Sequence, residues 1–163
     1  MSVIQIFIYQ IKKIMKEKTL IILKPDCVRK GFRDQVIGRF VQDGFTILEK
    51  RERKATYDEL FEHYEGTGQL KTRLEAEGRA HVFDEVMEFM QSDTIVPLLM
   101  EREDAIARAR KLAGATCPWK AEKGTIRADF GLLDPDAPIE NVIHASANAK
   151  EAEKEIALWF PKR

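Results

Sequence analysis

The chain has 163 residues, of which 44% are hydrophobic and 33% are charged, and this composition is typical of a soluble globular protein. Its 27 Lys and Arg residues balance 27 Asp and Glu residues, so the net charge gives no reason to expect nucleic acid or an anionic membrane as a partner. Cys27 and Cys117 lie far apart and without a CxxC motif, so we expect reduced thiols, which favours a cytoplasmic location.

At this length we expect one domain, over residues 17–163, preceded by an appendage at residues 1–16. The appendage is rich in Ile, Val and Phe but is shorter than the roughly 20 apolar residues that span a bilayer. Its lysines, Lys12 and Lys13, follow the apolar run instead of preceding it, which is not the pattern of a secretory signal. We therefore expect this segment either to pack locally or to form an oligomer contact, with no membrane involved.

Strand and helix patterns alternate along the domain. A continuous apolar run at residues 19–23 predicts a strand that is buried on both faces. Apolar residues at helical spacing from Asp34 predict a helix that Gly44 ends, and a capping-box pattern at Thr56 predicts a short helix that runs to Tyr64. The other expected elements are strands at 45–54, 94–100 and 142–143, helices at 82–90, 104–112 and from Asn148, a surface excursion at 66–78 with one helical turn at 70–74, and loops at 115–125 and 134–138.

This order of elements predicts an α+β fold. Four strands separated by helices fit a ferredoxin-like, four-stranded antiparallel sheet covered by helices on one face, with further helices and loops inserted. Because one fold hosts many activities, the fold by itself leaves the function open.

One histidine lies between two expected elements. Val142 and Ile143 are β-branched and predict a short strand, with His144 where that strand ends. Asn148 and Glu151 form a capping-box pattern that opens the last helix. A histidine fixed in this way and accessible from one side suits a nucleophile or a proton carrier. The alternative is a partly buried histidine that is hydrogen-bonded to the backbone.

A glutamate on the last helix is the expected partner of that histidine. The buried stripe of the helix is formed by Ala152, Ile156, Trp159 and Phe160. Glu155 lies at the flank of this stripe, where a carboxylate costs free energy unless it is partnered. The strand that carries His144 leads directly into the helix, so we expect the imidazole to be the partner, with Ser146 holding the carboxylate in turn. The alternative is an ion pair between Glu155 and a lysine.

Four residues are candidate ligands for an anion: Lys24, Arg110, Thr116 and Arg127. Each lies at the end of an element or in a loop, and guanidinium, ammonium and hydroxyl groups all bind phosphate oxygens. Taken singly, any one of these residues is more often a solvated surface residue, and only their combination would indicate an anion site. The chain has no G-x-x-x-x-G-K-[ST], G-x-G-x-x-G, H-E-x-x-H or G-x-S-x-G motif, so a P-loop or Rossmann enzyme is not indicated.

Three segments together resemble the nucleoside diphosphate kinase family. They are Lys24-Pro25-Asp26 after the buried strand, GTIRADF at 124–130, and NVIHAS at 141–146 followed by AEKEIALWF at 152–160. The match runs in the family's order from about residue 17 to residue 160. The resemblance implies ping-pong transfer of the γ-phosphate of ATP or another nucleoside triphosphate to a nucleoside diphosphate. The intermediate would be a pros-phosphohistidine at His144.

The resemblance also implies roles for the site residues. The expected catalytic residues are His144, Lys24, Glu155, Ser146 and Tyr64, and the expected nucleotide-binding residues are Lys24, Val82, Arg110, Thr116, Arg127 and Asn141. Asn141 would bind the ribose, and Val82 is the expected platform for the base, where the family commonly has an aromatic ring. Mg²⁺ would be the cofactor, held through the nucleotide phosphates and not by protein side chains. The family forms hexamers and tetramers, so we expect a homo-oligomer.

The chain departs from the family pattern at several positions. Cys27 stands where the family usually has glycine, Ala147 where it has aspartate, and Cys117 where it has asparagine. The segment at residues 66–80 is longer than usual, so the family's phosphate-contacting arginine is either Arg79 or missing. Residues 134–138 are a second insertion. Two alternatives on the same fold are a nucleotide-binding regulatory module without turnover and a protein-histidine phosphotransfer protein. The presence of His144 together with the lysine and asparagine of the motifs favours the enzyme.

Overall fold

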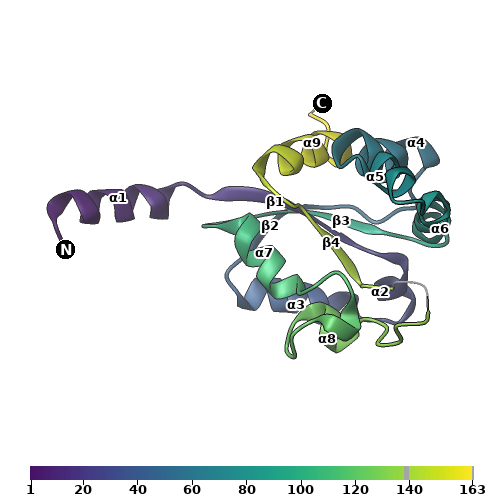
Figure 1. Ribbon diagram of the computed structural model, residues 1–163. Helices are drawn as coiled ribbons and strands as arrows, with labels where there is room; N and C mark the ends of the chain where they lie inside the picture. The colour runs from purple at the N-terminus through teal and green to yellow at the C-terminus, as the bar shows by residue number, and fades with distance from the viewer. Residues whose placement is uncertain (138–139, 163) are drawn as a thin grey trace.

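The computed structural model describes residues 1–137 and 140–162, the side chains of residues 12–14 excepted (Figure 1). A four-stranded sheet in the order β2-β3-β1-β4 forms its centre, and every neighbouring pair is antiparallel, as predicted. Its strands are β1 (Glu17–Leu23), β2 (Thr46–Lys50), β3 (Val96–Arg102) and β4 (Ile143–Ala145).

Strand β4 is short and holds the histidine in its middle. His144 lies opposite Ile22 of β1, with Ile143 opposite Leu23 and Ala145 opposite Ile21. The prediction that His144 lies where the strand ends is therefore wrong by one residue. Strand β4 is at the edge of the sheet, and its pairing with the buried residues Ile21, Ile22 and Leu23 of β1 fixes the backbone of His144.

Helices cover both faces of the sheet, not one face as predicted (Figure 1). The reason lies in β1, where Leu20 and Ile22 face one side, Ile21 and Leu23 face the other, and all four have no exposed surface. The helices of the domain are α2 (Pro25–Arg29), α3 (Arg33–Gln42), α4 (Tyr57–Phe61), α5 (Leu70–Ala76), α6 (Ala80–Gln91), α7 (Ala105–Ala113), α8 (Ile126–Phe130) and α9 (Ala149–Trp159), with a π-helical turn η1 (Glu62–Thr67) and a 3₁₀ turn η2 (Pro118–Lys120).

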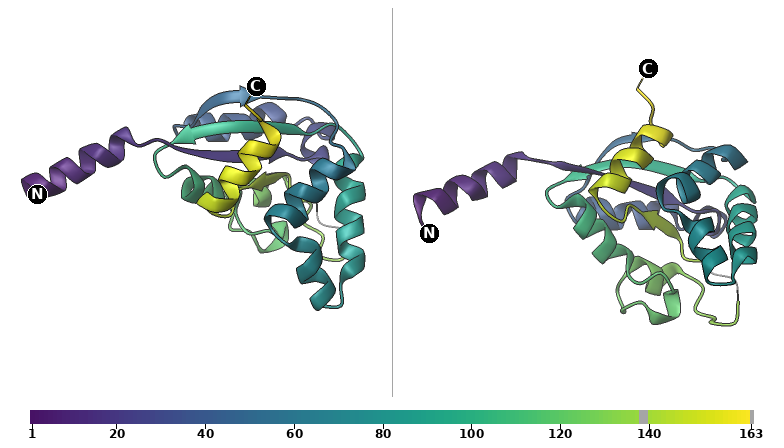
Figure 2. Two further views of the ribbon diagram at one scale, coloured as in Figure 1. Left: turned by 90° about the horizontal axis from the view of Figure 1, so that it is seen from above. Right: turned by 45° about the horizontal axis from the view of Figure 1, so that its top comes forward.

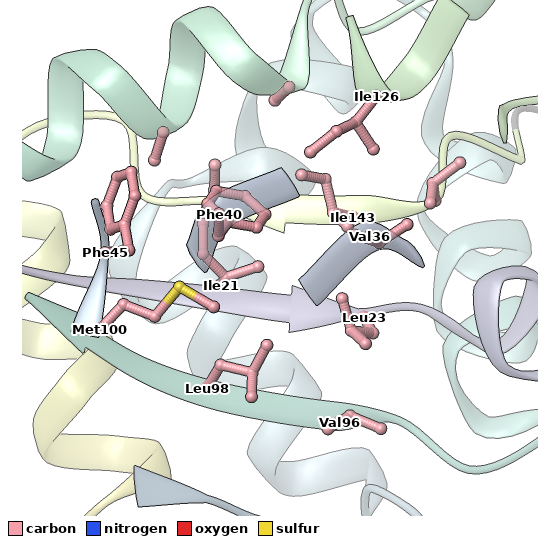
Figure 3. Packing of buried hydrophobic residues seen from close by; sticks show 14 of the residues in the cluster. Ile21, Leu23, Val36, Phe40, Phe45, Val96, Leu98, Met100, Ile126 and Ile143 are labelled. Atoms are coloured by element: carbon pink, nitrogen blue, oxygen red, sulfur yellow. The ribbon is translucent and has the colours of Figure 1, made fainter. Parts of the chain in front are cut away.

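Two hydrophobic cores result, one on each face. Helices α2, α3, α7 and α8 pack on the first face, around residues that include Ile21, Phe40 and Met100 (Figure 3). Helices α4, α5, α6 and α9 pack on the second face, around residues that include Phe83 and Trp159. Burial of a large apolar side chain stabilises the fold by about 1.5–3 kcal/mol. The first core holds β4 through Ile143 and Ala145, and the second holds α9 through Trp159. These two elements carry His144 and Glu155.

The predicted boundaries hold for most helices and fail for the longer insertions. The capping box of α4 is formed, since Oγ1 of Thr56 accepts from the backbone N–H of Glu59 and the Glu59 carboxylate accepts from that of Thr56. The expected surface excursion at 66–78 contains a helix of seven residues, α5, anchored by the buried Leu74. Helix α8 was not predicted at all. The loop at 134–138 is described as far as residue 137, and its last residue, Pro138, lies outside the described residues.

The N-terminal segment forms a helix, α1 (Val3–Ile14), that stands clear of the domain (Figure 2). Ser2 and Gln5 form a capping box at its start. Its apolar side chains are in solvent, with Val3 83% and Phe7 63% exposed. The alternative in which this segment packs locally is therefore wrong. In the described part of the chain, no helix combines the length and the apolar character needed to cross a bilayer.

Candidate active site

A cavity of about 380 Å³ opens at β4, and it is lined by residues of η1, α5, α8, α9, the end of α7 and the loop that follows α7. Eight of the residues selected from the sequence line it: Lys24, Tyr64, Arg110, Thr116, Arg127, Asn141, His144 and Glu155. Ser146 is fully buried behind Glu155. Val82 does not line the cavity, because it lies on α6 and packs against the core of the second face. The structure thus brings together every selected residue except Val82.

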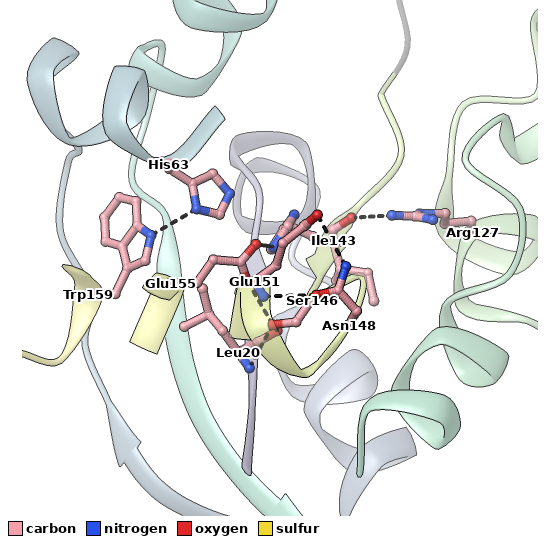
Figure 4. A network of polar contacts seen from close by, with 10 residues as sticks. Leu20, His63, Arg127, Ile143, Ser146, Asn148, Glu151, Glu155 and Trp159 are labelled. Carbon is pink, nitrogen blue, oxygen red and sulfur yellow. Dashed lines mark hydrogen bonds and ion pairs between the residues drawn. The ribbon is translucent and has the colours of Figure 1, made fainter. Parts of the chain in front are cut away.

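His144, Glu155 and Ser146 form a hydrogen-bonded chain, of which Figure 4 labels Glu155 and Ser146. Nε2 of His144 lies 3.0 Å from Oε1 of Glu155, and the Ser146 hydroxyl donates to Oε2 of Glu155 at 2.7 Å. A carboxylate only accepts hydrogen bonds, so Nε2 of His144 carries the proton. Nδ1 of His144 then has a free lone pair. The predicted partnership is present, and it leaves Nδ1 as the nucleophilic nitrogen.

Burial fixes the geometry of these hydrogen bonds. Glu155 is only 1% exposed, and a buried carboxylate without partners is costly. Ser146 is itself fixed to the central strand, since its hydroxyl accepts from the backbone N–H of Leu20 at 3.2 Å. The carboxylate is therefore held from both oxygens, and the imidazole ring it supports cannot rotate without breaking a buried hydrogen bond.

A lysine and an asparagine that line the cavity are hydrogen-bonded to each other. Nζ of Lys24 donates to Oδ1 of Asn141 at 2.7 Å, and Nδ2 of Asn141 donates to the carbonyl of Thr116 at 3.0 Å. Burial, with a further contribution from the positive charge of Arg127, lowers the pKa of Lys24 to about 8. Lys24 is therefore a cation at neutral pH that is held by a neutral acceptor, with donors left for an anion.

Arg127 is tied to the backbone on three sides. Its guanidinium donates to the carbonyls of Gly114 at 3.0 Å, Asn141 at 3.2 Å and Ile143 at 2.8 Å. Burial and the nearby charge of Arg110 lower its pKa to about 10. Three of its five N–H donors serve these carbonyls, so the remaining two are available to a ligand. Arg127 therefore joins the segments that form the cavity as well as placing charge in it.

A strained residue precedes the histidine. Val142 has φ +73°, which is rare for a β-branched residue. Its N–H donates to Oδ2 of Asp26 at 3.0 Å, and its carbonyl accepts from the N–H of Lys24 at 2.9 Å. These bonds hold the strained conformation, which turns Asn141 toward the cavity while His144 enters β4. The sequence motif contained Asp26, but its spacing gave no sign of this role.

Two further cavity residues were missed in the sequence. His63 in η1 lines the cavity, and its ring centroid lies 4.4 Å from that of His144. Its only signal was that it precedes Tyr64 at the end of a capped helix. Arg73 in α5 also lines the cavity, with Leu70 one turn earlier. Their spacing along the polar insertion was the signal, since residues three apart share one face of a helix.

The arginine considered from the family pattern lies elsewhere. Arg79 does not line the cavity, its side chain is 54% exposed, and its guanidinium pairs with Glu77 at 3.2 Å.

Of the departures from the family pattern, Cys27 is fully buried in α2, and burial raises the pKa of its thiol to about 12. Cys117 is partly exposed and Ala147 is exposed, and neither lines the cavity.

The chain is similar to known proteins over nearly its whole length. The family model described as nucleoside diphosphate kinase matches residues 17–163. A nucleoside diphosphate kinase of Methanococcus maripaludis is 41% identical over 88% of this chain and 98% of the relative. One of Rhodococcus opacus is 40% identical over 91% of this chain and 97% of the relative.

Solved structures agree in fold. A crystal structure of the Aquifex aeolicus nucleoside diphosphate kinase superposes with a TM-score of 0.76 at 34% identity, covering 90% of this chain and 96% of the other. That of the Borrelia burgdorferi enzyme, a transition-state mimic with bound vanadate and ADP, gives a TM-score of 0.81 at 32% identity, covering 91% and 89%.

Proposed function

Because the chain belongs to the nucleoside diphosphate kinase family, we propose that it transfers the γ-phosphoryl group of ATP or another nucleoside triphosphate to a nucleoside diphosphate. The transfer passes through a pros-phosphohistidine at His144. The observation that carries this proposal is the free Nδ1 of His144, held in a cavity by a hydrogen bond from Nε2 to Glu155. The Borrelia relative binds ADP with vanadate as a transition-state mimic, which supports a nucleotide as the ligand.

The reaction has two half-reactions at the same atom. In the first, the lone pair of Nδ1 attacks the γ-phosphorus, an N–P bond forms, and the bond to the bridging oxygen breaks, so that the diphosphate leaves with the electron pair. The imidazole gains positive charge, which the Glu155 carboxylate stabilises. In the second, a terminal oxygen of another nucleoside diphosphate attacks the phosphorus and the N–P bond breaks. His144 is then neutral again.

The remaining polar groups place the nucleotide. Phosphoryl transfer depends on in-line placement and on spreading of negative charge more than on proton transfer. We assign the phosphate oxygens to Lys24, Arg110, Thr116 and Arg127, and the ribose hydroxyls to Asn141 and Lys24. Tyr64 lies beside them, and its buried hydroxyl has no hydrogen-bond partner among the described residues. It therefore offers a donor to the same group.

Helix α5 supplies a further part of the site. Val82 was the expected platform for the base, but the residue that α5 places at the cavity is Leu70. Arg73 lies one turn further on the same helix and also lines the cavity, whereas Arg79 is in solvent. We therefore assign the apolar contact with the base to Leu70, and to Arg73 the phosphate contact that the family makes with an arginine near this point.

Magnesium would be held through the nucleotide. Of the described residues, Glu151 and Glu155 are the carboxylates at the cavity, and both oxygens of Glu155 are already bonded within the protein. Mg²⁺ requires oxygen ligands, and the nitrogens of His63 and His144 do not suit it. These residues fit a metal bound by the phosphates, where it would neutralise their charge. The protein's own part is to bind and orient the nucleotide.

The helix α1 supports assembly into a homo-oligomer, a hexamer or a tetramer. Its large exposed hydrophobic side chains are Val3, Ile4, Ile6, Phe7, Ile8, Tyr9 and Ile11. An isolated helix of this length is marginal in water, and large exposed apolar patches mark interaction sites. Light scattering should therefore give a multiple of the chain mass, and glutamate at Ile4 and Phe7 should lower it. A monomeric parent protein would contradict the assignment.

The remaining assignments concern the domain and its location. Residues 17–163 are the catalytic domain, to which residues 1–16 add the segment with α1. Both cysteines are free thiols, which fits a reducing compartment and supports a cytoplasmic location.

Phosphorylation of the protein itself tests the function. The chain is incubated with ATP and Mg²⁺ without an acceptor, and the protein is assayed for phosphate that is acid-labile and alkali-stable. GDP is then added, with the His144→Ala variant treated in parallel. We expect the label to appear, to move to GTP, and to be absent from the variant. A folded protein that takes no label would be a regulatory module, and label that no nucleoside diphosphate removes would indicate a protein phosphotransfer protein.

A further inference from the structure

His63 is a buried histidine at the catalytic cavity with no assigned role. It lies in the π-helical turn η1, is 3% exposed, and packs edge-on against His144 with an interplanar angle of 78°. One of its ring nitrogens lies within 4.8 Å of one ring nitrogen of His144. Its ring is therefore a direct neighbour of the ring that reacts.

A tryptophan fixes which nitrogen of His63 carries the proton. Nε1 of Trp159 lies 3.2 Å from Nδ1 of His63 (Figure 4). An indole N–H can only donate, so Nδ1 must accept. In the neutral ring the proton is then on Nε2, which faces away from Trp159. The contact is buried, so water cannot compete for it, and the tautomer is set by the fold.

His63 is also held neutral. Burial lowers its pKa well below the usual value, and the nearby His144 and Lys24 lower it further. The proton on Nε2 thus belongs to an uncharged donor. This donor is buried and has no hydrogen-bond partner among the described residues. A buried donor without a partner costs about 1–3 kcal/mol, so its retention beside a nucleophile points to a ligand that supplies the acceptor.

A metal ion does not fit this nitrogen. Coordination needs a lone pair, and Nε2 of His63 has none while Nδ1 accepts from Trp159. The ligand must instead bring an oxygen acceptor. The group that enters this space in the proposed reaction is the phosphoryl group on its way to or from Nδ1 of His144, and its oxygens gain negative charge during transfer.

We propose that His63 donates a hydrogen bond from Nε2 to the transferred phosphoryl group, and that Trp159 acts as a positioning residue that fixes the donor tautomer. The inference rests on the function proposed above and adds a substrate contact to it. Because the contact is made to the group in transfer, it stabilises the transition state more than bound nucleotide.

Substitutions at His63 test the contact. His63→Phe keeps an aromatic ring and removes the donor, so kcat should fall about 10²–10³-fold, the range for loss of one such donor at a reacting oxygen, with KM changed less than about threefold. His63→Gln places an amide N–H near the position of Nε2, and it should recover most of the lost rate. The matched control is His81→Phe, since His81 is an exposed histidine outside the cavity. It should leave kcat unchanged.

The tautomer of His63 can be measured first in the parent protein, where no substitution disturbs the fold. Nitrogen-15 NMR of the parent protein should show Nε2 of His63 protonated and Nδ1 unprotonated, and Trp159→Phe should introduce the other tautomer. Protonation at Nδ1 in the parent protein would overturn the proposal. So would a folded His63→Phe variant with kcat within twofold of the parent, while a parent protein that forms no phosphohistidine would instead refute the proposed function.

Discussion

Glu155→Gln is the substitution whose effect the geometry determines most closely. Both carboxylate oxygens are bonded, Oε1 at 3.0 Å from Nε2 of His144 and Oε2 at 2.7 Å from the Ser146 hydroxyl. Glutamine has nearly the same shape, so packing around this residue, which is 1% exposed, should be retained. What changes is the charge and one donor.

The amide has a preferred orientation in this pocket. The Ser146 hydroxyl donates toward residue 155, which favours the amide oxygen on that side and the NH₂ group toward His144. Nε2 of His144 must then accept, and its proton moves to Nδ1. The nucleophilic lone pair is lost in this state. Glutamine should therefore act through the tautomer as well as through the charge.

The two effects give an expected magnitude. A hydrogen bond to a charged group contributes about 1.5–3 kcal/mol, and the unfavourable tautomer adds about one further factor of ten, or 1.4 kcal/mol. The rate of phosphorylation by ATP should fall about 10²–10³-fold. The assay is a single turnover with labelled ATP, quenched in alkali and read as protein-bound phosphate, with thermal unfolding measured in parallel.

Ser146→Ala is the matched control. It keeps the carboxylate and its charge on His144 but leaves the backbone N–H of Leu20 without its acceptor. We expect a loss of about 1–3 kcal/mol in the free energy of unfolding and a rate within about tenfold of the parent. The reasoning is refuted if Glu155→Gln is phosphorylated within fivefold of the parent rate, or if it loses stability as Ser146→Ala does.

Three further predictions concern the cationic side of the site. Because the pKa of Lys24 is about 8, kcat/KM for ATP should fall as pH rises above 8, since the protonated fraction drops from about 0.9 at pH 7 to about 0.1 at pH 9. The charge of Asp26 raises that pKa, so in Asp26→Asn the fall should begin at lower pH, as pH–rate profiles will show; an unshifted profile would argue against Lys24. Arg73→Ala should raise KM for nucleotides about tenfold, whereas Arg79→Ala should change it less than twofold in steady-state assays. The reverse order would return the phosphate contact to Arg79.

The pairing of His144 with Glu155 could be predicted because the sequence patterns that indicate it are local. Glu155 lies four residues before Trp159 and three after Ala152, so helical geometry alone places it at the flank of a buried stripe. The direct connection from β4 to α9 leaves His144 as its nearest partner. Short connections keep consecutive elements adjacent in space, and this is why sequence spacing sufficed here.

The other side of the cavity depends on contacts between distant segments. The tautomer of His63 depends on a hydrogen bond from Trp159, which is 96 residues away in the sequence. No periodicity within η1 identifies His63 as a site residue. The polar, glycine-containing composition of residues 66–78 predicts a surface excursion. Leu70 and Leu74, however, lie four residues apart, and a neighbouring surface is enough for them to form a helix. Packing against α6 and η1 supplies that surface and brings Arg73 to the cavity.

The hydrogen-bond acceptors of the two buried cations are uncharged, and this explains how the cavity can bind phosphate. Lys24 is held by the amide oxygen of Asn141, and Arg127 by three backbone carbonyls. A carboxylate in their place would satisfy the same donors but would cancel the positive charge. The buried carboxylate of Glu155 instead accepts hydrogen bonds from His144 and from the Ser146 hydroxyl. Burial is the main cause of the lowered pKa of Lys24. Because the side chain that accepts from its ammonium, Asn141, is neutral, the positive charge of Lys24 remains available to a ligand that brings negative charge.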